Sequence, residues 1–526
     1  MKRRSFIAAS AASAASALAR PAIAQGKKPI VFVPQGNLVT MDPVWTTATV
    51  TRNAANMVYE TLYGRDQKMN PKLQMLEGVL TEDGGKRVTM TLRDGLTFHD
   101  GEKVLARDAV ASLKRWMKRD GGGQTIESRL DVLEATDDRT LVFRLKKPFA
   151  GLPMALSKTQ QTPIIVPERL ANTDPFKQMP EAIGSGAFRY MAKDYVSGHQ
   201  AVFTRNEKYI PRDEPASNTS GGLRVLVDRV EWRVIPDAAT AAGALASGEI
   251  DWVEAPLPDL LPMLRKAAGV SVGVLDEAGY YGVLRPNWLH GPTANVGVRR
   301  AMLAAISQVD IMTATMGDDK SLFRAPVGIF VPGSQGANEA GMELVRKQKS
   351  IPEIKAMLKE AGYNGEKIVL FHPTDQVFYN GIVSVAASVF RAIGLNVDEQ
   401  SVDWGTVVER RTSKEPLDKG GWSMFPAGFP AAESVDPLLS TSVRGNGAKA
   451  WFGWPTDEKL EQLRETWLDT VDPAEQLKLC QQIQARCLDQ VTLIPVGQYL
   501  PASAWGKTIS APLKGLCPIF WGVTKA

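Results

Sequence analysis

Side chains that commonly carry out catalysis or bind metals are few in this sequence, and they lie far apart. The histidines and cysteines are His99, His199, His290, His372, Cys480, Cys487 and Cys517. None of them belongs to an H-E-x-x-H or C-x-x-C pattern, and no G-x-S-x-G is present. A "GKT" at 506–508 suggests a phosphate-binding loop, but Pro501 stands where that loop requires a glycine. The residues therefore predict a protein that is not an enzyme and holds no metal or cofactor, with a secreted enzyme as an alternative.

The stretch "GWSMFPAGFP" (421–430) is unusual in another way. It contains two glycines, two prolines, two phenylalanines, a tryptophan and a methionine, and Ser423 is its only side chain that can hydrogen-bond through oxygen. Such a run is too broken for a helix interior and too apolar for an ordinary surface loop. We therefore predict a loop that faces something other than water.

Length and charge narrow the possible classes. A chain of 526 residues exceeds what one hydrophobic core usually holds, so two or three lobes are expected. The formal net charge is +5, but residues 1–24 contain four basic residues and no acid, which leaves 5 − 4 = +1 for the rest. A nearly neutral chain gives no support for binding to nucleic acid or to an anionic membrane.

The N-terminus is typical of an export signal. A basic start is followed by an Ala/Ser-rich stretch and by Ala-Ile-Ala at 22–24. Arg3 and Arg4 before Ser-Phe resemble a twin-arginine signal, with an ordinary secretion signal as the alternative. No later stretch approaches the roughly 18 apolar residues of a membrane helix, and no cysteine follows the signal. We expect an exported, soluble periplasmic protein without a lipid anchor. Its three cysteines are expected to be buried thiols, with a disulfide from Cys480 or Cys487 to Cys517 as the alternative.

Strand-like and helix-like segments alternate along the remaining chain, which predicts a mixed α/β fold. Strands are predicted at 29–34, 87–95, 138–149, 229–237, 367–372 and 395–402, and helices at 51–64, 106–120, 238–251, 351–363 and 380–393. Asp237 is placed to cap the helix at 238, and Gly248 is placed to end it. The best linker candidate is the Pro- and Gly-containing segment 211–222, which is expected to form an exposed loop.

Several of these segments closely resemble one known family. "TLRDGLTFHDGEKVLARDAVASLKR" (91–115) is similar to the signature segment of family 5 extracellular solute-binding proteins, the dipeptide-, oligopeptide- and nickel-binding components of ABC importers. "IGSGAFRY" (183–190), "RVIPDAATAAGALASGEIDWV" (233–253) and "IGLNVDEQSVDWGTV" (393–407) match further landmarks in the same order. The resemblance covers essentially all of residues 29–510.

This resemblance implies a periplasmic binding protein type II-like α/β fold, with two hinged lobes and a ligand enclosed between them. Lobe I is expected at 26–64, 185–283 and 500–526, an extra domain packed on it at 65–184, and lobe II at 284–499. Two crossing segments should join the lobes, and such clefts between lobes favour ligand pockets and hinge closure.

The resemblance also implies a place for the ligand. Trp404 matches a tryptophan that lines the cleft of dipeptide-binding relatives, and Trp422 matches the tryptophan before their ligand-binding loop. In those relatives an aspartate three residues further on pairs with the peptide ammonium, but here that position is Phe425. Segment 372–380 also lacks the arginine that clamps a dipeptide carboxylate. We therefore expect 421–430 to face a different kind of ligand, with packing inside the lobe as the alternative.

The predicted ligand-binding residues are Trp404, Trp422, Ser423, Phe425, Tyr280, Tyr281, Arg285, Met41 and Trp45. Tyrosines and an arginine near the first crossing segment can stack and hydrogen-bond, although core packing is an equal alternative for them. We expect a monomeric binding component of an ABC importer that carries a small organic solute to an inner-membrane permease complex. A peptide binder that uses main-chain contacts is a second hypothesis, and a chaperone-like interaction protein is a third.

Overall fold

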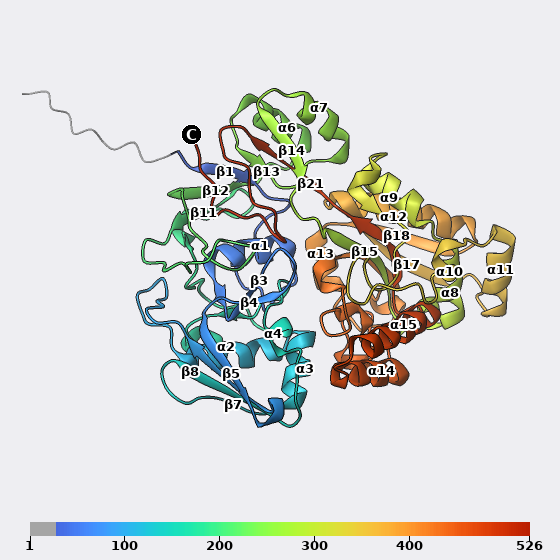
Figure 1. Cartoon of the computed structure of the whole chain (residues 1–526). Coiled ribbons are helices and arrows are strands. Elements are labelled where there is room, and N and C mark those ends of the chain that lie inside the picture. The colour runs from blue at the N-terminus through green and yellow to red at the C-terminus, as the bar shows by residue number, and fades with distance from the viewer. Residues whose placement is uncertain (1–27) are drawn as a thin grey trace, which may run out of the picture.

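The computed structural model describes residues 28–526, which form two lobes of mixed helix and sheet (Figure 1). The first half of the chain builds lobe I and the domain below it, and the yellow to red half builds lobe II. The last residues return to lobe I, where the C-terminus lies. The predicted α/β fold class is confirmed, whereas the export signal at 1–24 lies outside the described residues.

Lobe I is built around a seven-stranded sheet. Its strands, in spatial order, are β10 (Phe188–Tyr190), β11 (Gln200–Arg205), β12 (Arg229–Arg233), β1 (Ile30–Val33), β13 (Trp252–Val253), β21 (Ala502–Gly506) and β14 (Val270–Val274). β1 runs parallel to both of its neighbours, and all four residues of its "IVFV" are buried. A continuous apolar run is what a parallel strand covered on both faces requires.

Lobe II is built around a six-stranded sheet. Its strands, in spatial order, are β16 (Phe323–Arg324), β20 (Ile494–Tyr499), β15 (Tyr280–Pro286), β19 (Met424–Pro430), β17 (Lys367–Pro373) and β18 (Asn396–Val402). β17 and β18 are parallel, and β15 runs antiparallel to β19 and β20. Two segments connect this sheet to lobe I, namely 275–279 between β14 and β15, and 500–501 between β20 and β21.

A third sheet belongs to the extra domain. It is antiparallel, in the order β5 (Leu76–Glu82), β6 (Arg87–Leu92), β8 (Thr140–Leu145) and β7 (Leu130–Ala135). The residues of β6, "RVTMTL", alternate between intermediate and buried positions, as expected of a strand with one face on a core. The exact boundaries given above for the lobes and this domain remain a proposal.

The other elements complete the layers around these sheets. The helices are α1 (Thr49–Val58), α2 (Ala106–Met117), α3 (Gly121–Arg129), α4 (Leu152–Ala155), α5 (Glu168–Ala171), α6 (Ala238–Ser247), α7 (Leu261–Lys266), α8 (Val296–Ala305), α9 (Gln308–Met316), α10 (Glu343–Arg346), α11 (Ile351–Glu360), α12 (Val377–Ala392), α13 (Trp404–Arg410), α14 (Glu458–Asp469) and α15 (Pro473–Gln490). Short strands are β2 (Glu60–Thr61), β3 (Tyr63–Arg65), β4 (Pro71–Leu73) and β9 (Ile164–Ile165). Within residues 28–526, no helix has the length and apolar character needed to cross a membrane.

Two predicted elements are wrong in part. The helix expected at 51–64 ends at Val58, because the following residues pair as β2 with β9 and as β3 with β4. The expected loop 421–430 is mostly strand β19, a central member of the lobe II sheet. The three cysteines are buried and unpaired, as predicted.

The prolines of β19 fit a central strand because of where its partners lie. β17 pairs with β19 only at Met424, so beyond that residue one side of β19 has no strand neighbour within residues 28–526. On that side the backbone N–H of Gly428 donates to the Tyr379 hydroxyl at 3.0 Å. Since backbone directions repeat every second residue, Pro426 and Pro430 turn their nitrogens to the same side. The side on which each proline lacks an N–H therefore faces away from β15. The hydrogen bonds between β15 and β19 do not need that N–H.

Candidate functional site

Two tyrosine hydroxyls, from β20 and α12, converge on Gly428 of β19. A Cβ atom at this glycine would lie 2.3 Å from the Tyr499 hydroxyl and 3.2 Å from that of Tyr379. Tyr499 stacks on Tyr280 with ring centroids 5.5 Å apart, and on Phe378 with centroids 5.2 Å apart. These rings meet around Gly428, where only glycine fits. We call Tyr280, Tyr379, Tyr499 and Phe378 the tyrosine cluster.

A second group of rings surrounds the side chain of Arg411, the residue that follows α13. The guanidinium carbon lies 4.7 Å from the ring centre of Phe452, 5.5 Å from Trp404, 5.6 Å from Trp451 and 5.8 Å from Phe425. We call these four rings the aromatic cage. In Figure 1, α13 lies at the margin of lobe II nearest lobe I.

Within residues 28–526, the guanidinium in this cage has no hydrogen-bond or ion-pair partner. Arg411 is 4% exposed, and its Nε atom is buried without a hydrogen bond. Burial lowers the pKa of Arg411 to about 10, while Tyr379 acts in the opposite direction. A pKa of that size keeps the group charged at neutral pH. The arrangement can therefore accept an anion into apolar surroundings.

The two groups of rings meet, and several of them are only partly buried. The ring centres of Trp404 and Tyr379 lie 5.1 Å apart, and this contact links the aromatic cage to the tyrosine cluster. Trp404, Tyr379, Trp451 and Phe452 retain intermediate exposure, whereas Phe425 is fully buried. Aromatic rings with one accessible side are suited to cover an apolar solute.

Two of the predicted ligand-binding residues, Ser423 and Trp422, make hydrogen bonds within lobe II instead. The Ser423 hydroxyl accepts the backbone N–H of Val369 at 3.0 Å, and Ser423 N–H donates to the Val369 carbonyl at 2.9 Å. Trp422 is fully buried, donates from its Nε1 to the Ser413 carbonyl and packs against Phe425 at 5.0 Å. Both residues support the cage from behind.

Tyr281 and Arg285 are likewise fully buried and satisfied within lobe II. The Tyr281 hydroxyl donates to the Gly328 carbonyl at 2.8 Å. Arg285 donates to the carbonyls of Phe452 at 2.7 Å and Thr492 at 2.9 Å, and burial lowers its pKa to about 9. These contacts fix segment 451–452, and with it one wall of the cage.

Tyr280 stands at the junction of the lobes. Its hydroxyl accepts from Arg52 of α1 at 3.3 Å, and burial is the main cause of the raised pKa of Tyr280. In the same region, Glu254 after β13 accepts from Asn53 at 2.6 Å, and burial raises the pKa of Glu254. The two lobes are thus joined beside the first crossing segment by a polar network.

Met41 and Trp45 lie on lobe I. Met41 lines a cavity of about 430 Å³ between the loop after β1 and residues 178–183. The Trp45 carbonyl accepts from Arg119 at 2.9 Å. Neither residue contacts the cage through any hydrogen bond, ring pair or ion pair found within residues 28–526.

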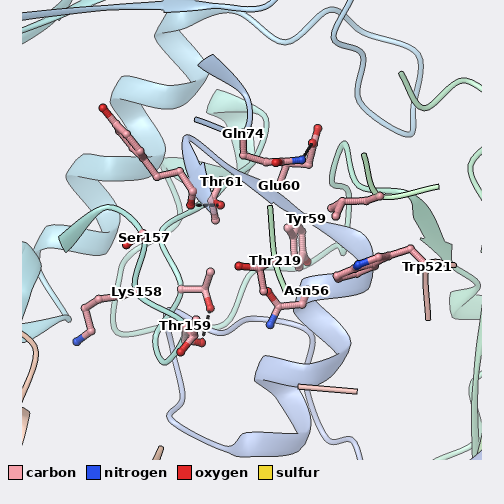
Figure 2. A pocket seen from close by; sticks show the side chains of 13 residues that line it. Asn56, Tyr59, Glu60, Thr61, Gln74, Ser157, Lys158, Thr159, Thr219 and Trp521 are labelled. Atoms are coloured by element: carbon pink, nitrogen blue, oxygen red, sulfur yellow. Dashed lines mark hydrogen bonds between the residues drawn. The ribbon is translucent and has the colours of Figure 1, made fainter. Parts of the chain in front are cut away.

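A smaller polar cavity lies where α1 and β2 meet the extra domain (Figure 2). Its walls include Glu60, whose pKa is raised by burial, and Trp521, whose Nε1 has no hydrogen-bond partner among the residues that the structure describes. Its volume of about 20 Å³ has room for about one water molecule. This cavity is too small for an organic solute.

Next to that cavity, a buried carboxylate reaches from lobe II to the extra domain. Oε1 of Glu433 accepts from the backbone N–H and the hydroxyl of Thr159, each at 2.8 Å, and lies 3.8 Å from Nη2 of Arg65. A second contact, at the surface, joins Arg129 to Glu465 of α14 at 2.7 Å. These contacts hold the lobes together in the present conformation.

No metal site is visible in the part of the chain that the structure describes. Within residues 28–526, no three His, Cys, Asp or Glu side chains gather in a way that could hold an ion. His99 is buried at its turn, and burial lowers its pKa to about 4. The candidate site therefore consists of the aromatic cage, Arg411 and the tyrosine cluster.

Comparison with known proteins identifies the family. Residues 70–447 match the family model described as bacterial extracellular solute-binding proteins, family 5. This chain belongs to that family. A relative from Sinorhizobium fredii (strain NGR234), described as a probable peptide ABC transporter periplasmic-binding protein, is 35% identical over 522 residues, covering 99% of this chain and 98% of its own. The predicted family and the predicted class, a solute-binding protein of an ABC importer, are confirmed.

Other similar proteins differ in what they are reported to bind. The oligopeptide-binding protein AppA of Bacillus subtilis is 24% identical, covering 81% of this chain and 78% of its own. A structure of AgaA from A. tumefaciens R10 with agropinic acid has a TM-score of 0.80 at 19% identity, covering 95% of this chain and 99% of the other. A dipeptide-binding protein from Pseudoalteromonas sp. SM9913 with Met-Leu also gives 0.80, at 18% identity, covering 95% and 100%. These structures show that the fold is shared and confirm the periplasmic binding protein type II-like architecture.

Sequence reasoning missed Arg411. It follows Trp404 by seven residues, and the intervening helix brings both side chains to the same rings. "ERRTSK" is typical of an ordinary charged helix end, and nothing in it separates half-buried Arg410 from buried Arg411. The signal would have been the position of Arg411 two turns after a tryptophan already assigned to the cleft.

Proposed function

We propose that this protein is the periplasmic binding component of an ABC importer, which closes its two lobes on one small organic solute and passes it to an inner-membrane permease. The supporting observation is the set of partly exposed rings around Arg411 and Gly428, at the margin of lobe II beside the lobe junction. Trp404, Trp451 and Phe452 pack against the core on one side and keep the other side accessible, which suits contact with an apolar solute. The two crossing segments give the lobes a hinge.

We also propose that the protein acts as an exported monomer. It binds its solute without altering it, because the aromatic cage offers no nucleophile or general base. Peptides are the second candidate ligand, since the relative from Sinorhizobium fredii is described as a probable peptide-binding protein. A free peptide would bring an ammonium group to Phe425 and its neighbours, where desolvating that charge costs several kcal/mol.

The test is to identify the solute that accompanies the protein. Protein purified from the periplasm without denaturation is analysed by native mass spectrometry, and the released compound is then returned to ligand-free protein. We expect one bound molecule per chain and a smaller radius of gyration by small-angle scattering at saturation. A radius that stays constant with every compound that binds would contradict the importer role.

A further inference from the structure

Arg411 differs from the other buried arginines of this chain. Among residues 28–526, every other buried arginine donates at least one side-chain hydrogen bond. Arg464, for example, donates to the Pro437 carbonyl at 2.7 Å, and Arg299 donates to the Thr293 carbonyl at 2.8 Å. Arg411 donates none to any of these residues and forms no ion pair with them, and its Nε is fully enclosed. A buried charge without a hydrogen-bonded partner is costly, and the four rings around it offset only part of that cost. An anion from outside the chain would offset the rest.

The surroundings of Arg411 define what that group can be. Rings face the guanidinium from four residues, and no carboxylate is among the groups that shift its pKa. Apolar walls strengthen attraction to an anion and repel an ammonium group through lost hydration. A guanidinium binds a planar carboxylate through two parallel hydrogen bonds. One guanidinium also balances one negative charge, which suits a carboxylate better than a phosphate dianion.

We propose that Arg411 anchors the carboxylate of an organic acid whose apolar or aromatic part lies against Trp404, Trp451 and Phe452. This inference rests on the proposed binding function and adds the ligand class. The Tyr379 hydroxyl, which accepts the Gly428 N–H, keeps its own proton to donate to the same ligand. An α-ammonium group next to the carboxylate would be placed among the rings, so acids without one bind best.

The test compares acids with their neutral amides. The probes are phenylacetate with phenylacetamide, indole-3-acetate with indole-3-acetamide, and N-acetyl-leucine with its amide, with phenethylamine as the cationic probe. Dissociation constants are measured by calorimetry on ligand-free wild type, Arg411→Met and Arg411→Lys. Arg410→Met is the matched control, because the Arg410 side chain points to Gln400 at 2.9 Å and to the Phe371 ring rather than into the cage.

We expect the wild type to bind at least one acid about 10- to 100-fold more tightly than its amide, which is the range for a hydrogen-bonded charge pair. Arg411→Met should remove that preference, Arg411→Lys should keep part of it, and Arg410→Met should keep all of it. Ligand-free Arg411→Met should melt at the same temperature as the wild type or higher, because the substitution removes an unpaired buried charge.

Two results would overturn the inference. One is a wild type that binds no acid more tightly than its amide, and the other is an acid preference that survives in Arg411→Met. A lower melting temperature of Arg411→Met with unchanged acid preference would assign Arg411 a packing role instead. In either case, a neutral compound that reduces the radius of gyration would leave the importer function standing.

Discussion

Glu433 offers a direct test of how the lobes are held together. Its side chain is 3% exposed and crosses from lobe II to the extra domain, where it accepts two hydrogen bonds from Thr159 and lies near Arg65. When the lobes separate, water replaces all of these contacts. Glu433→Ala therefore penalises only the closed conformation, in which the Thr159 N–H would be left buried without an acceptor.

The expected change in the free energy of opening follows from the hydrogen bonds that Glu433 accepts. Hydrogen bonds to a charged group contribute about 1.5–3 kcal/mol each, and part of this is offset by the cost of burying the carboxylate. We expect a net loss of about 2–3 kcal/mol for Glu433→Ala, or about 30- to 150-fold in the opening equilibrium. Glu433→Gln keeps an acceptor for Thr159 and should lose about 1 kcal/mol.

Hydrogen exchange measures this without a known ligand. The Thr159 amide should exchange about 30- to 150-fold faster in Glu433→Ala than in the wild type, because its protection follows the free energy of opening. Glu465→Ala is the control, since Glu465 also bridges the lobes but is about half exposed, and Asp469 still pairs with Arg129. Equal exchange in Glu433→Ala and the wild type would show that this contact does not hold the lobes closed.

Three further substitutions test separate parts of the argument. Gly428→Ala should cost about 1–3 kcal/mol in stability and weaken solute binding, because its Cβ would overlap the Tyr499 hydroxyl; denaturant unfolding and calorimetry measure both effects. Trp404→Ala should weaken binding by about 1–3 kcal/mol with an unchanged melting temperature, and a collapsed melting temperature with unchanged affinity would mean a core role. Burial lowers the pKa of His99 to about 4, so the folded protein holds it neutral and loses up to about 3 kcal/mol as the pH falls from 6.5 to 4. His99→Gln should remove that loss, which unfolding curves between pH 4 and 8 would reveal.

Elements specified by local chemistry could be predicted from the sequence. The alternating pattern predicted β6, whose residues alternate between intermediate and buried positions, and the continuous apolar run predicted β1, which is fully buried. Asp237 accepts from the Thr240 N–H at 2.7 Å as the predicted helix cap, and Gly248 ends that helix with a φ of 79°. In each case the residues that carry the signal also make the contact, so distant parts of the chain do not have to be known.

Features that depend on distant partners could not be predicted. β19 contains two prolines that count against a central strand, and it is possible only because β17 diverges after Met424. The linker candidate 211–222 was expected to be exposed, yet Asn218 is buried and accepts the Leu516 N–H at 3.1 Å. A sequence pattern does not show which strand diverges, or that the C-terminal segment returns to cover a loop.

The charges at positions 411 and 425 depend on each other. The resemblance to peptide-binding relatives places an ammonium-binding aspartate at the position of Phe425, and here the Phe425 ring lies 5.8 Å from the Arg411 guanidinium. An aspartate at 425 would place a negative charge near that guanidinium and offset part of its charge, so Arg411 would attract an anionic solute less strongly. With phenylalanine at 425, Arg411 keeps its charge unpaired beside the accessible rings. The absence of an aspartate at 425 is therefore a condition for the unpaired arginine.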